Sequence, residues 1–149
     1  MKKRIWLSIV IALTVVVIDQ ITKYLVRTHI GAYESIELLP ILNLVNVQNR
    51  GAAFGMFASF GNIFFISISF VALAFMSWVI VKDKEDYRIF ALLAGGAAGN
   101  LIDRLTLGYV VDFADVSVAG HHWPAFNVAD SALSVGMVFM ALSILRKNR

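Results

Sequence analysis

The sequence contains no cysteine and only two prolines among its 149 residues. Without cysteine the chain has no disulfide, no thiolate nucleophile and no cysteine-bound zinc or iron–sulfur cluster. Charged residues are also scarce, at 15% of the chain against about 25% in an ordinary soluble domain. Any catalysis must therefore rely on oxygen and nitrogen groups, and few charged side chains are present to cover a soluble surface.

Apolar residues make up 59% of the chain, and the mean hydropathy of +0.76 is typical of a protein dissolved in lipid. A helix that rises 1.5 Å per residue needs about 20 residues to cross the hydrocarbon core. Four apolar stretches of about that length predict an all-α integral membrane protein, a single domain over residues 1–149. These stretches are Ile5–Val26, Ile63–Val81, Ile89–Leu107 and Val128–Leu145.

The basic residues predict how these four transmembrane helices are oriented. Nine of the 13 lysines and arginines flank the same ends of the apolar stretches, so the positive-inside rule makes that side, with both termini, cytoplasmic. They are Lys2, Lys3, Arg4, Lys82, Lys84, Arg88, Arg146, Lys147 and Arg149. Because the basic residues flank apolar stretches and do not form a basic face, we expect no nucleic-acid partner.

The first outer connection contains segments whose residue patterns predict local structure. Two β-like pieces, Ile36–Leu39 and Leu42–Val47, are separated by Pro40 and predict a small β-rich element on the membrane surface. The apolar segment Ala53–Phe60 predicts a short interfacial helix or a hydrophobic lip. We expect Phe57 and Phe60 to lie at the level of the lipid headgroups, and Phe54 is a candidate for covering the site.

Polar residues gather at the outer ends of the predicted helices. An ionisable group within a membrane span costs at least ~2.5–3.5 kcal/mol, so each such residue is a functional hypothesis. The spans and topology place all of these residues at one depth, which predicts a polar pocket just beneath the outer membrane surface. The residues are Asp19, Lys23, Asn100, Asp103, Arg104, Asp112, Asp115, Asn127 and Asp130.

Several of these residues also have a structural interpretation. Asp19 and Lys23 are spaced i,i+4, which favours an ion pair that fixes the first helix. Gly96 and Gly99 lie among small residues and predict close helix packing.

The start of the last helix and the two adjacent histidines have local explanations too. Asn127 and Asp130 fit a capping box, in which the first is the N-cap and the second its partner at N3. His121 and His122 are neighbours whose side chains point apart in an extended chain, so we expect no metal site and no cofactor.

The acids offer one kind of chemistry. Two aspartates held close together share one proton, so that one acts as a base and the other as an acid. The ionised member takes a proton from water, and the protonated member polarises a scissile carbonyl. The candidates are Asp103, Asp112 and Asp130. We favour Asp112 with Asp130, because Asp112 lies on an extended segment that can be aimed at the last helix, and the pair of Asp103 with Asp130 stays open.

Five ordered motifs extend over essentially the whole chain. They are Asp19–Lys23, Asn49–Gly55, Gly99–Arg104, Val110–Phe113 and Phe126–Ser131. With these motifs the chain resembles the lipoprotein signal peptidases, the type II signal peptidases of bacteria. The resemblance implies a membrane aspartyl endopeptidase that removes signal peptides from prolipoproteins, cutting before a cysteine that carries a diacylglyceryl group. It implies prolipoprotein signal peptides and membrane lipid as partners, and the bacterial cytoplasmic (inner) membrane as location.

The resemblance also assigns roles to residues. It maps the catalytic dyad to Asp112 and Asp130, the pair favoured on physical grounds, with the active site near the periplasmic face. It implies that Asn49 and Arg104 contact the substrate, and that three further residues orient the dyad: Asn100, Asp103 and Asn127. We expect a monomer. The alternative function is a small proton-coupled transporter or channel that uses the aspartates as a proton relay.

Overall fold

The computed structural model describes residues 1–51, 61–82 and 85–147. Its helices are α1 (Lys2–His29), α2 (Gly61–Lys82), α3 (Tyr87–Thr106) and α4 (Val128–Lys147). Its strands are β1 (Ser35–Leu39), β2 (Leu42–Asn49), β3 (Val110–Val118) and β4 (His121–His122). Each helix coincides with a predicted apolar stretch, to within a few residues at either end. The predicted lip over Ala53–Phe60 lies outside the described residues.

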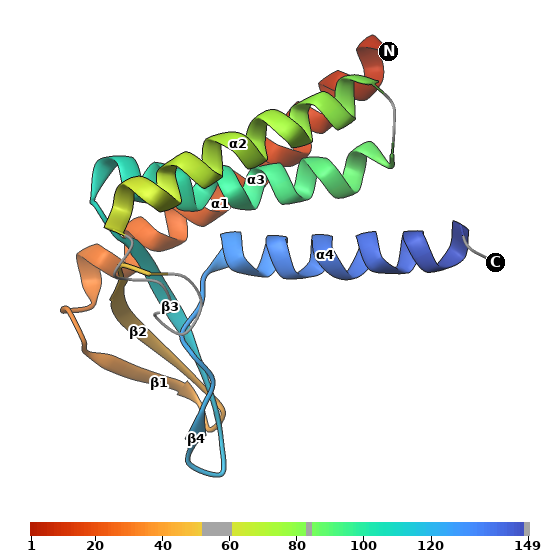
Figure 1. Ribbon diagram of the computed structural model, residues 1–149. Helices are drawn as coiled ribbons and strands as arrows, with labels where there is room; N and C mark the ends of the chain where they lie inside the picture. Colours follow the sequence, from red (N-terminus) through yellow and green to blue (C-terminus); the bar gives the residue numbers. More distant parts are fainter. Residues whose placement is uncertain (52–60, 83–84, 148–149) are drawn as a thin grey trace.

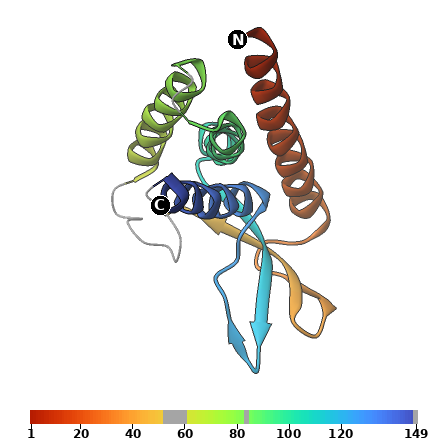
Figure 2. The same ribbon diagram turned by 90° about the vertical axis from the view of Figure 1, so that its right-hand side faces the viewer.

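Three of the described helices, α1, α2 and α4, are long and apolar enough to cross a membrane. Only 11–17% of the residues in their most apolar windows are buried within the protein, so most of their side chains face outward. Helix α3 contacts all three of them, and Figure 2 shows it nearly end-on among the others. Apolar helices that face outward around a more polar central helix are the arrangement of an integral membrane protein.

Glycines on α3 let the helices approach at backbone distance. A Cβ atom at Gly96 would lie 2.5 Å from the carbonyl oxygen of Ala129 on α4. One at Gly99 would lie 2.6 Å from the Oδ2 atom of Asp19 on α1. Neither position has room for a larger residue, and the close packing predicted from these small residues is confirmed. The consequence is that polar groups from three helices come within bonding distance of one another.

The strands form one antiparallel sheet in the order β1-β2-β3-β4, and it extends from one end of the helices (Figure 1). Strands β1 and β2 match the two predicted β-like pieces. Strands β3 and β4 come from the second connection, where the sequence predicted no sheet. Val47 on β2 pairs with Asp112 on β3, so Asp112 lies where the sheet joins the helices.

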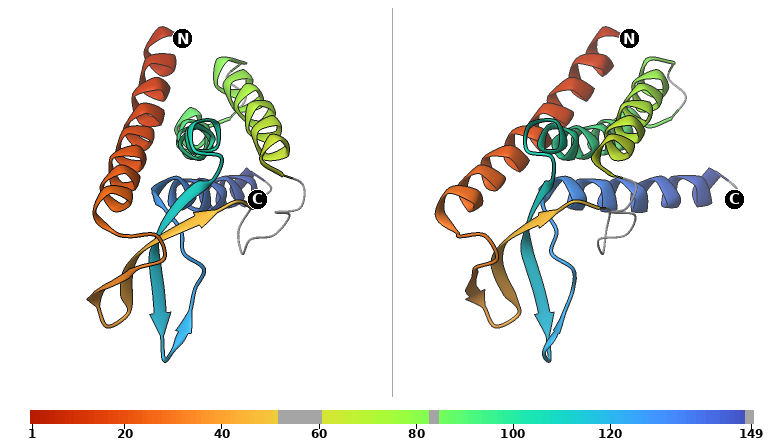
Figure 3. Two further views of the ribbon diagram at one scale, coloured as in Figure 1. Left: turned by 90° about the vertical axis from the view of Figure 1, so that its left-hand side faces the viewer. Right: turned by 60° about the vertical axis from the view of Figure 1, so that its left-hand side comes forward.

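The helices are not parallel along their whole length. Figure 1 shows both ends of the chain at the ends of the helices away from the sheet. Helices α1 and α4 lie close together beside the sheet and diverge toward the two chain ends, as the right-hand view of Figure 3 also shows. The sheet end is therefore where residues of α1, α3 and α4 gather.

Candidate active site

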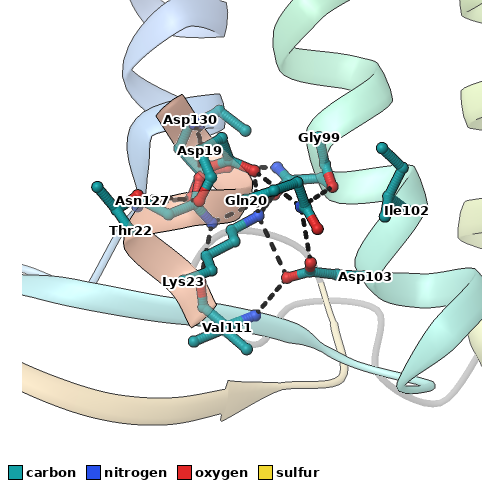
Figure 4. Close-up of polar contacts among 12 residues, drawn as sticks. Asp19, Gln20, Thr22, Lys23, Gly99, Ile102, Asp103, Val111, Asn127 and Asp130 are labelled. Carbon is teal, nitrogen blue, oxygen red and sulfur yellow. Dashed lines mark hydrogen bonds and ion pairs between the residues drawn. The ribbon is translucent and has the colours of Figure 1, made fainter. Parts of the chain in front are cut away.

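Most of the predicted polar residues come together where the helices meet the sheet, and Figure 4 shows five of them: Asp19, Lys23, Asp103, Asn127 and Asp130. Seven of the nine residues expected in the pocket are joined directly by hydrogen bonds or ion pairs, together with Asn49 from β2, and Arg104 joins them through Gly51. Asp115 is the exception. It lies farther along β3, where its carboxylate accepts a hydrogen bond from Asn43 at 3.1 Å and contacts the Nδ1 atom of His122 at 2.8 Å. The described residues contain no group of three or more histidine, aspartate or glutamate side chains that would hold a metal ion.

Lys23 lies at the centre of this group and is only 3% exposed. Its Nζ atom lies 2.8 Å from the Oδ2 atom of Asp19, as the predicted ion pair requires. It also lies 3.2 Å from the Oδ2 atom of Asp103 and donates to the Oδ1 atom of Asn100 at 2.9 Å. One ammonium group of α1 thus neutralises carboxylates on two helices and holds an amide of α3.

Asp103 is fully engaged in structural contacts. Its Oδ1 atom accepts a hydrogen bond from Gln20 at 3.0 Å, and its Oδ2 atom accepts one from the backbone N–H of Val111 at 2.9 Å. Its ion pair is with Lys23, and the neighbouring Arg104 points elsewhere. Asp103 therefore links α1 to the first residues of β3. Gln20 also donates to the carbonyl of Gly99, a contact for which the sequence carries no signal.

The start of α4 is held from two sides. Asn127 accepts a hydrogen bond from the backbone N–H of Asp130 at 2.8 Å, and its own N–H donates to the Oδ2 atom of Asp130 at 3.3 Å. This is the predicted capping box. In addition, the buried carboxylate of Asp19 accepts the N–H of Ala129 at 2.9 Å. Two N–H groups that a helix start leaves unpaired are thus satisfied by side chains from two different elements.

The carboxylates of Asp112 and Asp130 are held by amide side chains. Asp112 is 2% exposed and accepts hydrogen bonds from Asn127 at 2.7 Å and from Asn49 at 2.9 Å. Asp130 accepts one from Asn100 at 2.8 Å. Since Asn127 donates to a carboxylate oxygen of each aspartate, it fixes the position of one relative to the other.

The surroundings of Asp112 favour its neutral form. Burial is the main cause, and the negative charge of Asp130 adds to it; together they raise the pKa of Asp112 to about 7. Hydrogen bonds from Asn49 and Asn127 act in the opposite direction, because they stabilise the carboxylate. At pH 7 Asp112 is therefore protonated in about half of the molecules, whereas an exposed aspartate would be almost fully ionised.

Both aspartates line a cleft of about 780 Å³. The cleft continues along the membrane helices between apolar side chains, which include Ile68, Ala72 and Met76 of α2 and Leu133 and Met137 of α4. Its wall near the sheet includes Asn49 and Arg104. The arrangement thus combines a buried acid, Asp112, and a half-buried acid, Asp130, with an apolar cleft between α2 and α4.

Arg104 reaches across this cleft toward α2. Its guanidinium group lies 5.0 Å from the centre of the Phe65 ring and donates to the carbonyl of Gly51 at 3.1 Å. The positive charge of Arg104 is therefore fixed beside the two aspartates by contacts that do not involve them.

Two solved structures resemble this fold over nearly its whole length. Both are described as bacterial membrane enzymes solved by the in meso method, one at 2.3 Å and one at 1.9 Å resolution. The first has a TM-score of 0.89 and 36% sequence identity, with 97% of this chain and 90% of that chain covered. The second has a TM-score of 0.84 and 37% identity, with 95% and 94% covered. Fold and site thus belong to the class of integral membrane enzymes.

The sequence comparisons identify the family. The family described as signal peptidase (SPase) II matches residues 11–146. The chain belongs to the signal peptidase II family, whose members are membrane aspartyl peptidases. The lipoprotein signal peptidase of Thermodesulfovibrio yellowstonii is 48% identical over 89% of this chain and 90% of that protein. That of Geobacter metallireducens is 44% identical over 95% and 91%. The resemblance inferred from the five motifs is confirmed.

Proposed function

We propose that this peptidase removes the signal peptides of prolipoproteins, with Asp112 and Asp130 as its catalytic dyad. The observation that carries the proposal is that both carboxylates line one cleft, Asp112 buried and Asp130 half-buried, where Asn127 donates a hydrogen bond to each. The names of the relatives support the substrate class. A proton relay in a transporter is not favoured, because the family consists of peptidases and the buried acids gather at one end of the helices.

The proposed reaction uses the proton that the pair retains at neutral pH. The ionised aspartate takes a proton from a water molecule, whose oxygen attacks the scissile carbonyl carbon. The protonated aspartate donates to the carbonyl oxygen, and the tetrahedral intermediate then breaks its C–N bond. The leaving amine receives a proton from one aspartate, and the other aspartate takes a proton from a hydroxyl group of the intermediate, so the dyad returns to its singly protonated state. We assign the starting proton to the pair and not to one residue.

The other polar residues of the cleft have supporting roles in this proposal. Asn49 and Arg104 contact the substrate backbone, and the fixed guanidinium group of Arg104 provides donors beside the dyad. Asn100 and Asn127 orient the carboxylates through the hydrogen bonds described above. Asp103 is a positioning residue that acts through the start of β3.

The substrate in this proposal enters from the lipid. The apolar part of the signal peptide lies along the cleft walls formed by α2 and α4, and the acyl chains of the modified cysteine remain in the surrounding bilayer. This arrangement brings the peptide bond before that cysteine to the dyad while its hydrocarbon stays out of water.

We further propose that all four helices cross the bacterial inner membrane, with both termini in the cytoplasm. Helix α3 has 20 residues, which is about 30 Å and matches the hydrocarbon core. The positive-inside rule supports the orientation. In this orientation the sheet and the dyad lie near the periplasmic face, the side that secreted precursors reach.

The proposal is tested by Asp112→Asn and Asp130→Asn in the purified enzyme. We expect each variant to be folded and inserted in the membrane but unable to cleave a peptide that contains a diacylglyceryl-modified cysteine. The matched control is Asp115→Asn, which removes a carboxylate of the same strand outside the cleft and should leave cleavage intact. The unlipidated peptide should be a poor substrate for the parent enzyme. Normal cleavage by either Asp112→Asn or Asp130→Asn removes that residue from the dyad.

A further inference from the structure

A second cavity, of about 670 Å³, lies between α1, α3 and α4. We call it the terminal groove. It has no lining residue in common with the cleft that holds the two aspartates. Its origin is the divergence of α1 and α4, which are joined beside the sheet by the bond between Asp19 and Ala129 and separate toward the chain ends (Figures 1 and 3).

The walls of the terminal groove are apolar along the helices. They are formed by Ile11 of α1, by Ile89 and Leu92 of α3, and by Phe139 and Leu142 of α4. Phe139 and Leu142 are 52% and 45% exposed, so this half of α4 is not covered by the rest of the protein. Because α1 and α4 are apolar, outward-facing helices at this point, hydrocarbon and not water is the natural filling of such a groove.

The end of the terminal groove is charged, and its cations outnumber its acids. Arg88, Arg146 and Lys147 line it, with Asp86 as the one acid among the described lining residues. Arg88 pairs with Asp86 at 2.9 Å, and Lys147 pairs with Glu85 at 2.6 Å. Both pairs are largely exposed and therefore weak and easily exchanged.

Arg146 distinguishes the groove from an ordinary helix end. It is exposed and forms no ion pair with any residue of the described ranges. Its positive charge therefore lies beside an uncovered apolar surface, where it can attract an anionic group that arrives with an apolar tail.

We propose that the terminal groove binds an anionic glycerophospholipid, with an acyl chain along the apolar wall and the phosphate against Arg146 and Lys147. An acidic peptide would satisfy the cations but leave Phe139 and Leu142 uncovered. A zwitterionic lipid would fill the wall but add no net negative charge. Each basic side chain near the membrane surface favours an anionic lipid by about fivefold, which corresponds to about 1 kcal/mol.

Such a lipid would support the helix that carries Asp130. The first half of α4 packs closely on α3 through Ala129, Ala132 and Gly136, whereas most residues of the second half are exposed. A lipid in the groove gives that second half a packing partner, so it stabilises α4 without touching the dyad.

The absence of cysteine makes a direct test possible, because one introduced thiol is the only labelling site. Leu142→Cys places a bimane fluorophore at the groove, and Ser77→Cys places one at an exposed position of α2 about as far from its helix end. Each labelled protein is reconstituted with dibromo-phosphatidylglycerol or dibromo-phosphatidylcholine at equal mole fractions. Bromine quenches the fluorophore only when the acyl chain lies beside it.

At Leu142→Cys we expect the apparent affinity for phosphatidylglycerol to exceed that for phosphatidylcholine by about fivefold or more, and at Ser77→Cys we expect no difference. Adding Arg146→Gln with Lys147→Gln should abolish the preference. Adding Lys2→Gln with Lys3→Gln, which removes the same charge outside the groove, should leave it intact.

Three results would overturn the proposal. The first is equal quenching by the two lipids at Leu142→Cys. The second is a preference that survives the loss of Arg146 and Lys147. The third is a preference that is lost equally in the control pair, because it would then come from the charge of the whole surface and not from the groove.

Discussion

Replacing Asp112 by asparagine should abolish cleavage and at the same time stabilise the fold at alkaline pH. The reason is that burial and the nearby charge of Asp130 raise the pKa of Asp112 from 3.8 to about 7. A group whose pKa is raised on folding destabilises the protein as pH rises from its unfolded to its folded pKa. The wild-type enzyme should thus lose stability between about pH 4 and pH 7, and the variant should not.

The magnitude follows from the size of this shift. One pKa unit corresponds to about 1.4 kcal/mol, so the full penalty for ionising Asp112 is about 4 kcal/mol at pH 8 and about 2 kcal/mol at pH 5. Both Asn49 and Asn127 donate a hydrogen bond to the carboxylate of Asp112. In the asparagine variant the side-chain NH2 group, which is itself a donor, faces one of these two donors. That mismatch costs about 1–3 kcal/mol at either pH. The stability gain over wild type should therefore be ~2 kcal/mol larger at pH 8 than at pH 5.

The assay is reversible unfolding by SDS in mixed micelles, followed by circular dichroism at pH 5, 6, 7 and 8. The difference between variant and wild type isolates the titration of Asp112, because the other groups titrate in both proteins. Ser117→Ala, on the same strand, changes no titratable group and is the matched control; its difference from wild type should not vary with pH. A difference that stays constant from pH 5 to pH 8, or that shrinks, would refute the assignment of a raised pKa to Asp112.

Three further predictions concern the neighbouring residues. Since the reaction needs the shared proton, kcat/KM should fall on the alkaline side with a midpoint near the Asp112 pKa of about 7. Asn49→Ala removes a hydrogen bond that lowers this pKa, so it should move the midpoint to higher pH. A midpoint that moves to lower pH would contradict this prediction. Lys23→Ala leaves the buried carboxylates of Asp19 and Asp103 without a cation, so it should destabilise the protein by about 3–5 kcal/mol. The amount of protein in the membrane should fall more than the turnover number of the enzyme that remains. An abundant but inactive variant would argue against a structural role. Gly96→Ala brings a Cβ atom to 2.5 Å from the Ala129 carbonyl, and the displacement of α4 should cost about 1–3 kcal/mol in the same unfolding assay; parental stability would show that α4 can move freely.

The helices were predictable because a membrane restricts the conformation, composition and length of any segment that crosses it. A span must be helical, apolar and about 20 residues long, so length and composition alone locate it. The same constraint makes Asp19 and Asp103 conspicuous, since buried charges in a membrane need partners. The gathering of these residues at one end of the helices could be inferred for this reason.

The partners of individual residues were harder to predict. Strand β3 pairs with β2 across a long separation in sequence, and the local pattern of Val110–Val118 does not specify such pairing. The contact of Asp19 with the N–H of Ala129 is likewise invisible, because a backbone group has no residue signature. For Asp130, the sequence left helix capping and catalysis as competing explanations. In the structure one oxygen completes the cap and the other faces Asn100, so the two are compatible.

The bond between Asp19 and Ala129 has a consequence for biogenesis. The two residues lie near opposite ends of the chain, and translation delivers the first long before the last. Until the C-terminal helix leaves the ribosome and docks, Asp19 lacks its backbone partner, and Asp130, the second acid of the proposed dyad, is absent. With the dyad proposed above, a nascent or truncated chain that lacks α4 has no hydrolytic capacity.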